Sequence, residues 1–131
     1  MTDSTSILRT RIDEFLQQLV KLQSGLQTIL QSGPGEDAPD LSTLQDQCRS
    51  LQPQFQKILS LAAETPLPPG TESQIRPYLT ESNRLVRLIA LDAAFLKTAR
   101  QAQTLQARLA QIGERLSQLQ TLCQAGQTAL G

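Results

Sequence analysis

The sequence contains no histidine, and this absence removes several classes of catalytic site at once. Histidine is the usual general base near neutral pH, the partner of nucleophilic serine and cysteine, and the commonest metal ligand. The Glu-x-x-His pattern of di-iron helical bundles is excluded for the same reason. The segment Gly33-Pro34-Gly35 does not match a phosphate-binding loop, because it lacks both the spacing and the following lysine. We therefore expect a protein that is not an enzyme and needs no metal or cofactor.

Aromatic residues make up only 3% of the chain, and long apolar runs are missing. Strands favour Val, Ile, Tyr and Phe, whereas Leu and Gln, which together form about a third of this sequence, are typical of long helices. A helix that spans a bilayer needs about 20 consecutive apolar residues, and no segment approaches that length. The first residues have neither the basic nor the apolar region of a secretory signal. These features predict an all-α, cytoplasmic protein with no membrane span.

An excess of charge of one sign is also absent, since 12 basic side chains balance 12 acidic ones. Their distribution is uneven, because residues 1–64 carry five basic and eight acidic side chains while the later part is locally basic. The basic residues of that later part include Arg84, Arg87, Lys97, Arg100, Arg108 and Arg115. Either acidic and basic helices attract each other within the protein, or the basic part binds an acidic partner or nucleic acid. Nucleic acid is the less expected of these partners.

The length of 131 residues suits one ordinary domain, so we expect residues 1–131 to form a single helical domain. Its two cysteines, Cys48 and Cys123, both fall at apolar positions of predicted helices. The sequence therefore predicts buried free thiols that pack as small hydrophobic groups, with a disulfide or a redox sensor as the alternative.

Apolar residues in the first half recur at alternating steps of three and four, which is the spacing of a heptad seam. This spacing predicts a helix over about 5–31 and a second helix over about 41–64, joined by a loop over 32–40 that contains Gly and Pro. The first seam comprises Leu8, Ile12, Phe15, Leu19, Leu22, Leu26 and Ile29, and the second comprises Leu41, Leu44, Cys48, Leu51, Phe55, Ile58 and Ala62. Pro53 falls opposite the second seam, where it can bend the helix without entering the core.

A proline-rich loop over 65–70 precedes the third helical segment, which we expect to run over about 72–128 as one long helix. Thr71 and Gln74 resemble a capping box at its start. No proline follows Leu85, so nothing local demands a turn. The predicted seam comprises Leu88, Leu91, Phe95, Ala102, Leu105, Leu109, Ile112, Leu116, Leu119 and Cys123, interrupted at Thr98 and widened by Leu85, Ile89 and Leu96. Gly126 stands at the next seam position, where we expect the helix to fray or end.

Two shorter helices and one long helix would form an elongated bundle with apolar surface left in water. We expect homodimerisation to complete the bundle, with a monomeric bundle or a complex with another protein as alternatives. The later half of the long helix most needs a neighbour. The residues predicted for self-association are Leu105, Leu109, Ile112, Leu116 and Leu119.

Asp92 lies on the widened apolar face of the predicted long helix, beside Leu88, Leu91 and Phe95. A carboxylate in such surroundings needs a cationic partner. Candidates are Arg84, Arg87 or an arginine on another helix. We interpret Asp92 as half of an ion pair at the edge of the packing, with recognition of a partner as the alternative.

The segment Leu91-Asp92-Ala93-Ala94-Phe95-Leu96-Lys97-Thr98-Ala99-Arg100-Gln101-Ala102, continued by Gln106-Ala107-Arg108-Leu109 and by Leu122-Cys123, resembles the C-terminal part of a known family. This family is that of the cyanobacterial heterocyst-frequency control proteins, the PatD family. The similarity covers about the last 40 residues, and the earlier part shares only the helical layout. It implies a small regulator of how often vegetative cells differentiate, with a connection to the tubulin-like division protein FtsZ.

We therefore expect a regulatory adaptor that binds a cell-division filament protein through the long helix and its basic flank. The partner-binding residues predicted from the charge pattern and the resemblance are Arg84, Arg87, Asp92, Phe95, Arg100, Gln101 and Arg108. A purely structural, self-assembling helical protein is the first alternative. A regulator that binds nucleic acid through the basic flank is the second, and it would show a steep dependence on salt.

Overall fold

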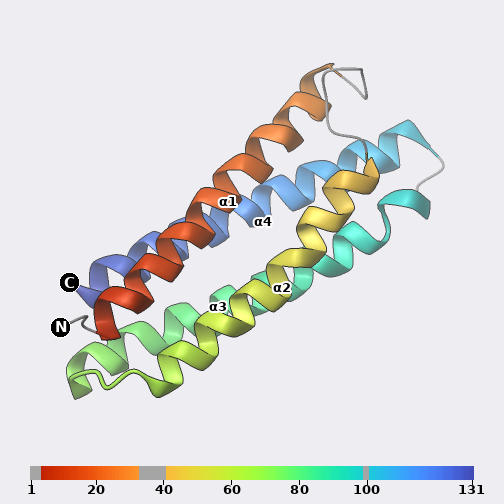
Figure 1. Cartoon of the computed structure of the whole chain (residues 1–131). Helices are drawn as coiled ribbons and strands as arrows, with labels where there is room; N and C mark the ends of the chain where they lie inside the picture. The colour runs from red at the N-terminus through yellow and green to blue at the C-terminus, as the bar shows by residue number, and fades with distance from the viewer. Residues whose placement is uncertain (1–3, 33–40, 99–100) are drawn as a thin grey trace.

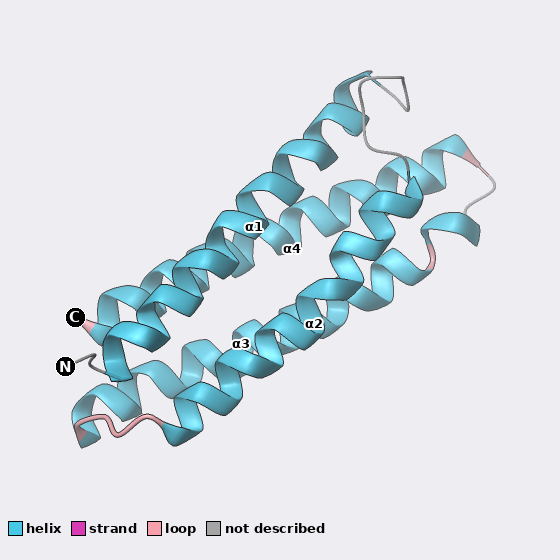
Figure 2. Cartoon of the chain, viewed as in Figure 1, coloured by secondary structure: helices cyan, strands magenta, loops and turns pink. Residues whose placement is uncertain are grey.

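The computed structural model describes residues 4–32, 41–98 and 101–131, and these form four α-helices. The helices are α1 (Ser4–Ser32), α2 (Leu41–Glu64), α3 (Pro69–Ala94) and α4 (Ala102–Leu130), and a short 3-10 helix, η1 (Leu96–Thr98), follows α3. No strand occurs among these residues (Figure 2). The all-α prediction is confirmed, whereas the predicted number of three helices is wrong.

The four helices run alternately up and down and form one bundle (Figure 1). Each helix packs against its neighbours in the chain, and α4 closes the bundle against α1. The connection between α2 and α3 lies at the same end of the bundle as the start of α1 and the end of α4, and the turn between α3 and α4 lies at the opposite end (Figure 1). Every helix therefore has two neighbours within one chain.

The predicted seams of α1, α2 and α4 form the core of the bundle. Buried seam residues are Leu8, Ile12, Phe15, Leu19, Leu22, Leu26 and Ile29 of α1, Leu44, Cys48, Leu51, Phe55 and Ile58 of α2, and Leu109, Ile112, Leu116, Leu119 and Cys123 of α4. The rings of Phe15 and Phe55 join the first two seams, with centroids 5.4 Å apart. Pro53 is exposed, and α2 continues through it. The heptad spacing thus predicted most of the inner side of these three helices, although Ala102, a predicted seam residue at the start of α4, is exposed.

The predicted long helix over 72–128 is wrong, because the chain turns back after Phe95. The backbone N–H of Phe95 donates to the carbonyl of Asp92, and that of Thr98 donates to the carbonyl of Phe95, each at 3.2 Å. Gln101 is extended, with φ −102° and ψ 139°. One continuous helix would leave the seam of α4 in water, whereas the turn brings it against α1 and α3. Burial of apolar surface, at about 25 cal/mol per Å², outweighs the local preference for a helix.

The residues of α3 that face the core are not the ones that the heptad spacing predicts. Its buried residues are Ile75, Ser82, Leu85, Val86, Ile89 and Ala93. Leu85 and Ile89 were expected only to widen the apolar face, yet they supply the core together with Leu96 of η1. Leu91 and Phe95, predicted as seam residues, are instead 53% and 47% exposed. The predicted seam of this segment therefore lies on the outside of the bundle.

α3 begins at Pro69 and not near residue 72 as predicted. Proline suits the first turn of a helix because its missing N–H would have no partner there. Pro68 occupies the N-cap position, and its carbonyl accepts the N–H of Glu72 at 2.9 Å. The expected capping box of Thr71 and Gln74 is wrong, because the cap lies before both residues and has no side-chain hydrogen bond.

Two glycines of α4 lie on its buried side. A Cβ on Gly113 would stand 3.1 Å from Cδ2 of Leu26, so the absence of a side chain allows α1 to approach closely. Gly126 was expected to end the helix, but α4 continues to Leu130, and the nearest atom to a Cβ at Gly126 would be Cβ of Tyr78 at 3.9 Å. Burial against α3 stabilises this last turn despite the poor helical propensity of glycine.

Candidate functional site

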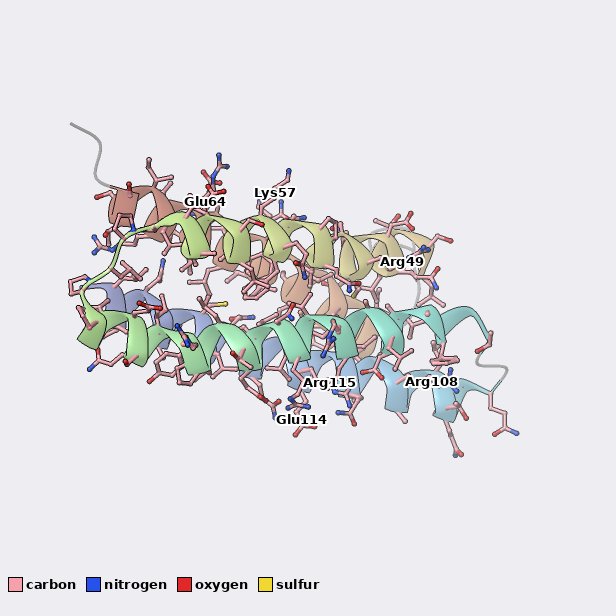
Figure 3. The ribbon with its side chains drawn as sticks, turned by 90° about the horizontal axis from the view of Figure 1, so that it is seen from below. Arg49, Lys57, Glu64, Arg108, Glu114 and Arg115 are labelled. Carbon is pink, nitrogen blue, oxygen red and sulfur yellow. The ribbon has the colours of Figure 1, made fainter. Side chains whose placement is uncertain are left out.

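The outer side of α3 and the adjoining side of α4 gather most of the residues that were predicted to bind a partner. We call this surface the α3–α4 face. It comprises Arg84, Arg87, Leu88, Leu91 and Asp92 of α3, Phe95 at its end, and Arg108 and Arg115 of α4. Arg108 and Arg115 lie on the opposite side of the bundle from Arg49, Lys57 and Glu64 of α2 (Figure 3).

Leu91 and Phe95 are the apolar part of this face. They are four residues apart and therefore lie on one side of the helix. Only four large apolar side chains are exposed in the described part of the chain, and the other two, Ile7 and Val20, both belong to α1. A pair of half-exposed apolar groups beside charged ones is typical of a binding surface.

Arg108 fixes the turn between α3 and α4. Its guanidinium lies over the ring of Phe95, 5.4 Å from the centroid, and Nη1 donates to the backbone carbonyl of Phe95. The same nitrogen lies 3.4 Å from Oγ1 of Thr98, which in turn donates to the carbonyl of Phe95 at 2.9 Å. A cation over an aromatic ring at an exposed position contributes about 0.5–1 kcal/mol. Arg108 therefore holds the Phe95 ring on the surface and caps the end of α3.

Asp92 and Arg115 form the ion pair of this face, with Oδ2 and Nη1 2.6 Å apart. Both side chains are mostly buried, at 23% and 22% exposed, and Nη1 also lies 3.4 Å from the carbonyl oxygen of Leu88. Burial raises the pKa of Asp92, and the positive charges of Arg115 and Arg108 offset only part of that rise. Of the three candidates for the partner of Asp92, namely Arg84, Arg87 or an arginine on another helix, the structure shows the third, because the turn after Phe95 places Arg115 on a separate helix.

Arg84 and Arg87 extend the face toward the middle of α3, and both are exposed. The guanidinium of Arg84 donates to both carboxylate oxygens of Glu81, and this hydrogen bond lowers the pKa of Glu81. Arg87 has no hydrogen bond or ion pair with the residues that the structure describes. One of the two arginines is thus neutralised by its own helix, and the other is not.

Two predicted partner-binding residues remain, Gln101 and Arg100. Gln101 is exposed and occupies the N-cap position of α4 without a side-chain cap bond. Arg100 lies outside the described residues. Sequence reasoning did not select Leu91 or Arg115 for the site, although both belong to the face. The signal for Leu91 was the second apolar stripe of α3, and the signal for Arg115 was the need of Asp92 for a cation.

The residues predicted for self-association are placed in the core of the single chain. Leu109, Ile112, Leu116 and Leu119 are at most 2% exposed, and Leu105 is partly buried against them. α1 and α3 cover these side chains, so their burial no longer requires a second copy.

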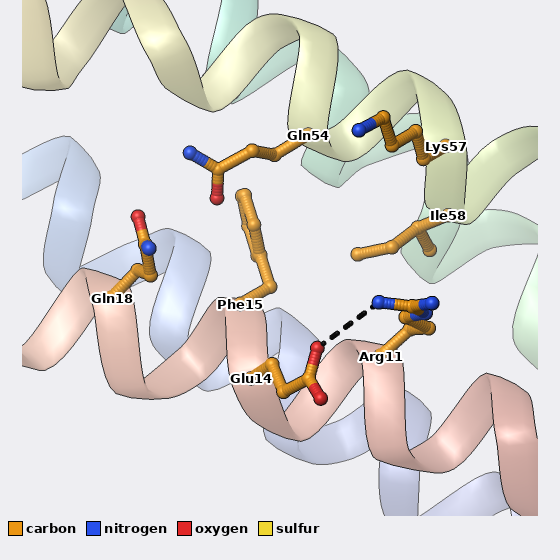
Figure 4. Close-up of a pocket in the computed structure, with 7 residues that line it drawn as sticks. All are labelled: Arg11, Glu14, Phe15, Gln18, Gln54, Lys57 and Ile58. Carbon is orange, nitrogen blue, oxygen red and sulfur yellow. Dashed lines mark hydrogen bonds and ion pairs between the residues drawn. The ribbon is translucent and has the colours of Figure 1, made fainter.

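Hollows also occur elsewhere on the bundle, one of about 620 Å³ along the first turns of α3 and one of about 350 Å³ between α2 and the start of α3. One between α1 and α2 has a volume of about 170 Å³ and is lined by Arg11, Glu14, Phe15, Gln18, Gln54, Lys57 and Ile58 (Figure 4). Sites for small-molecule ligands usually measure about 300–1,000 Å³. Arg11 and Glu14 on its rim already pair with each other at 3.4 Å. This hollow is therefore smaller than a typical site for a small-molecule ligand.

The two thiols are free and buried, as the sequence predicts. Burial raises the pKa of Cys48 to about 12, with a further contribution from the charge of Asp92. Burial also raises the pKa of Cys123 to about 12, although a hydrogen bond with Ser82 opposes the rise. Both thiols therefore stay protonated at neutral pH and lack the thiolate that nucleophilic chemistry needs.

Within residues 4–32, 41–98 and 101–131, no group of three or more acidic or cysteine side chains is placed to hold a metal ion. No helix of that part of the chain is long and apolar enough to cross a bilayer. Comparison of the chain with protein-family models, curated proteins and solved structures yields no match.

Proposed function

We propose that the chain is a non-enzymatic, cytoplasmic regulatory adaptor that binds another protein through the α3–α4 face. The half-exposure of Leu91 and Phe95 beside Arg108 is the observation that carries this proposal. Aromatic side chains and arginine are enriched among the residues that dominate binding energy at protein interfaces. The ring of Phe95 is held in place before binding, which lowers the entropic cost of association.

The state of the potentially reactive groups also supports a binding role over a catalytic one. The two thiols are protonated, and Asp92 is engaged with Arg115. A general base or nucleophile would need a free group with a suitable pKa beside a site for substrate. Asp92, Arg108 and Arg115 instead connect α3 with α4.

The identity of the partner rests on the resemblance to the heterocyst-frequency control proteins. The first residues that carry this resemblance, 91–102, comprise the end of α3, the turn and the start of α4. They include Leu91, Asp92 and Phe95 of the α3–α4 face. We therefore propose FtsZ as the partner, and regulation of division or of cell differentiation as the role.

Sedimentation with polymerised FtsZ tests this function. We expect the chain to sediment with the filaments, and Leu91→Asp to abolish sedimentation. Val20→Asp is the matched control, because Val20 is 57% exposed on α1 and lies outside the face. Absence of the folded chain from the pellet at low salt, or equal sedimentation of both variants, contradicts the proposal.

Homodimerisation stays a prediction that is independent of this function. The α3–α4 face is the apolar surface through which two bundles could still associate, since the predicted self-association residues are buried. Sedimentation velocity across a range of concentrations measures it. A dimer that Leu91→Asp dissociates would place the interface at this face, and a dimer that resists the substitution would place it elsewhere.

A further inference from the structure

α3 carries two apolar stripes, and the bundle uses only one of them. The inner stripe packs in the core, while Leu88, Leu91 and Phe95 follow the outer side in steps of three and four. Leu88 is half-buried, and the exposure of the other two is given above. Steps of three and four on one helix match the apolar stripe of a second helix laid along it. The outer stripe is therefore shaped to receive a helix.

The charges around this stripe are unbalanced in favour of arginine. Four arginines, at positions 84, 87, 108 and 115, stand against the three carboxylates of Glu81, Asp92 and Glu114, the last of which lies beside Arg115 (Figure 3). Arg84 and Arg115 make ion pairs with the first two of these carboxylates. Among the described residues, Arg87 and Arg108 have no carboxylate within ion-pair distance. The face thus presents an apolar centre with a positive group toward each end.

A trough continues the face onto α4. It measures about 460 Å³, and it is lined by Asp92, Gln103, Thr104, Ala107, Arg108 and Gln111. Asp92 of α3 and five residues of α4 line it, and it is wide open to solvent. Such a trough accommodates the side chains of an elongated partner better than an enclosed small molecule.

We propose that the α3–α4 face binds an amphipathic helix of the partner, whose apolar stripe packs on Leu91 and Phe95 and whose acidic side chains pair with Arg87 and Arg108. The inference rests on the proposed function, because it specifies the kind of segment that the adaptor recognises. A nucleic acid fits the face less well, because apolar side chains lie between the free cations and half of the arginines are neutralised. A second copy of the chain would bring the same surplus of arginine against itself.

Three labelled model peptides of about 15 residues test the proposal directly. All three carry Leu in steps of three and four, and they differ only in the residues that flank the Leu stripe, which are Glu, Gln or Lys. Fluorescence anisotropy with the full chain gives their affinities. We expect the Glu peptide to bind about fivefold or more tightly than the Gln peptide and to weaken as salt rises, and the Lys peptide to bind least.

Substitutions on the chain then assign the binding to the face. Leu91→Asp should abolish binding of the Glu peptide, and Val20→Asp should leave it unchanged. Arg87→Glu should weaken the Glu peptide by about fivefold and strengthen the Lys peptide, whereas Arg49→Glu, an exposed arginine on α2, should do neither. The helical circular dichroism of each variant confirms that it is folded.

Several results would overturn this inference while leaving the proposed function intact. If the three peptides bind equally well, acidic side chains of the partner do not contribute to its recognition. If none of the peptides binds while the chain still sediments with FtsZ, the partner segment is not an amphipathic helix. If a single-stranded DNA oligonucleotide binds more tightly than the Glu peptide and its binding depends steeply on salt, the face binds nucleic acid. If self-association of the chain competes with binding of the Glu peptide, the face binds a second copy. If the Glu peptide binds at the face and FtsZ does not, the docking inference stands and the identity of the partner is wrong.

Discussion

The seam of α4 and the outer stripe of α3 follow one heptad phase in the sequence, yet they have opposite surroundings. Leu116 of α4 is fully buried, whereas Leu91 of α3 is 53% exposed. Heptad spacing determines which residues share one side of a helix, and the neighbouring helices determine whether that side faces the core. On α3 a second stripe that includes Leu85, Val86 and Ile89 competes for the core and occupies it. Where a helix has two apolar stripes, the second is available to another molecule.

Matched truncations give the largest expected contrast between the two stripes. Leu116→Ala should lower the free energy of unfolding by about 2–5 kcal/mol, because it leaves a cavity in the core. Leu91→Ala should change it by less than about 0.5 kcal/mol, because the side chain packs little in the isolated chain. Urea denaturation followed by circular dichroism measures both. Similar losses for the two variants would mean that Leu91 is buried in solution, for instance in an oligomer.

Substitutions at the two buried glycines of α4 test how closely the neighbouring helices pack against the seam of α4. Gly113→Val should lower the free energy of unfolding by about 1–3 kcal/mol, because its Cβ would already stand 3.1 Å from Cδ2 of Leu26 and leave little room for the two methyl groups. Gly126→Ala should raise it by about 0.5–1 kcal/mol, because its Cβ meets only an ordinary contact and alanine favours the helix. Thermal unfolding gives both signs. A stabilising Gly113→Val would show that the α1–α4 contact is loose.

Two arginines of the α3–α4 face should differ in what they contribute to the fold. Arg108→Ala should cost about 1 kcal/mol, because it removes the hydrogen bond to the carbonyl of Phe95 and the contact with its ring. Arg87→Ala should remain within about 0.5 kcal/mol of the parent chain, since Arg87 has no bonding partner among the described residues. Denaturant titration measures the difference. Equal effects would contradict a role for Arg108 in holding the turn.

The smallest expected effects concern pH, and they have opposite signs at two carboxylates of α3. The pKa of Asp92 is raised in the fold, so its protonation favours the folded state, and this stabilisation is lost as pH rises through the raised pKa. The pKa of Glu81 is lowered, so its contribution is present above the unfolded pKa and is lost as pH falls. Between about pH 7 and pH 3, the Tm of the parent chain should therefore rise relative to Asp92→Asn and fall relative to Glu81→Gln. Shifts of the same sign in both comparisons would contradict this assignment.

Sequence reasoning identified the inner sides of α1, α2 and α4 because each of these helices has one dominant apolar stripe. The helical assignment of 41–64 holds at both ends despite Pro53, which lies on the exposed side and leaves the seam intact. Local spacing contains this information. The start of α3 was displaced by a few residues, because prolines that break one helix can also begin the next.

The turn after Phe95 could not be read from local sequence, because no proline or glycine marks it. The turn forms because it allows α1 and α3 to bury the seam of α4. The site depends on this turn. On a straight helix Phe95 and Arg108, which are 13 residues apart, would stand about 20 Å from each other, whereas in the bundle the guanidinium lies over the ring. Most of the predicted partner-binding residues lie on the face, but their mutual contacts come from tertiary packing.

The up-and-down order of the helices has a consequence for how quickly the chain folds. Three of the four helix pairs join neighbours in the sequence, and only the contact of α1 with α4 closes a long loop. That closing contact includes bonds from Arg9 to the carbonyl of Leu130 and from Gln23 to the carbonyl of Gly113, both at 3.3 Å. Proteins dominated by local contacts fold within microseconds to milliseconds. We therefore expect rapid folding in which the α3–α4 hairpin, and with it the α3–α4 face, assembles before α1 docks.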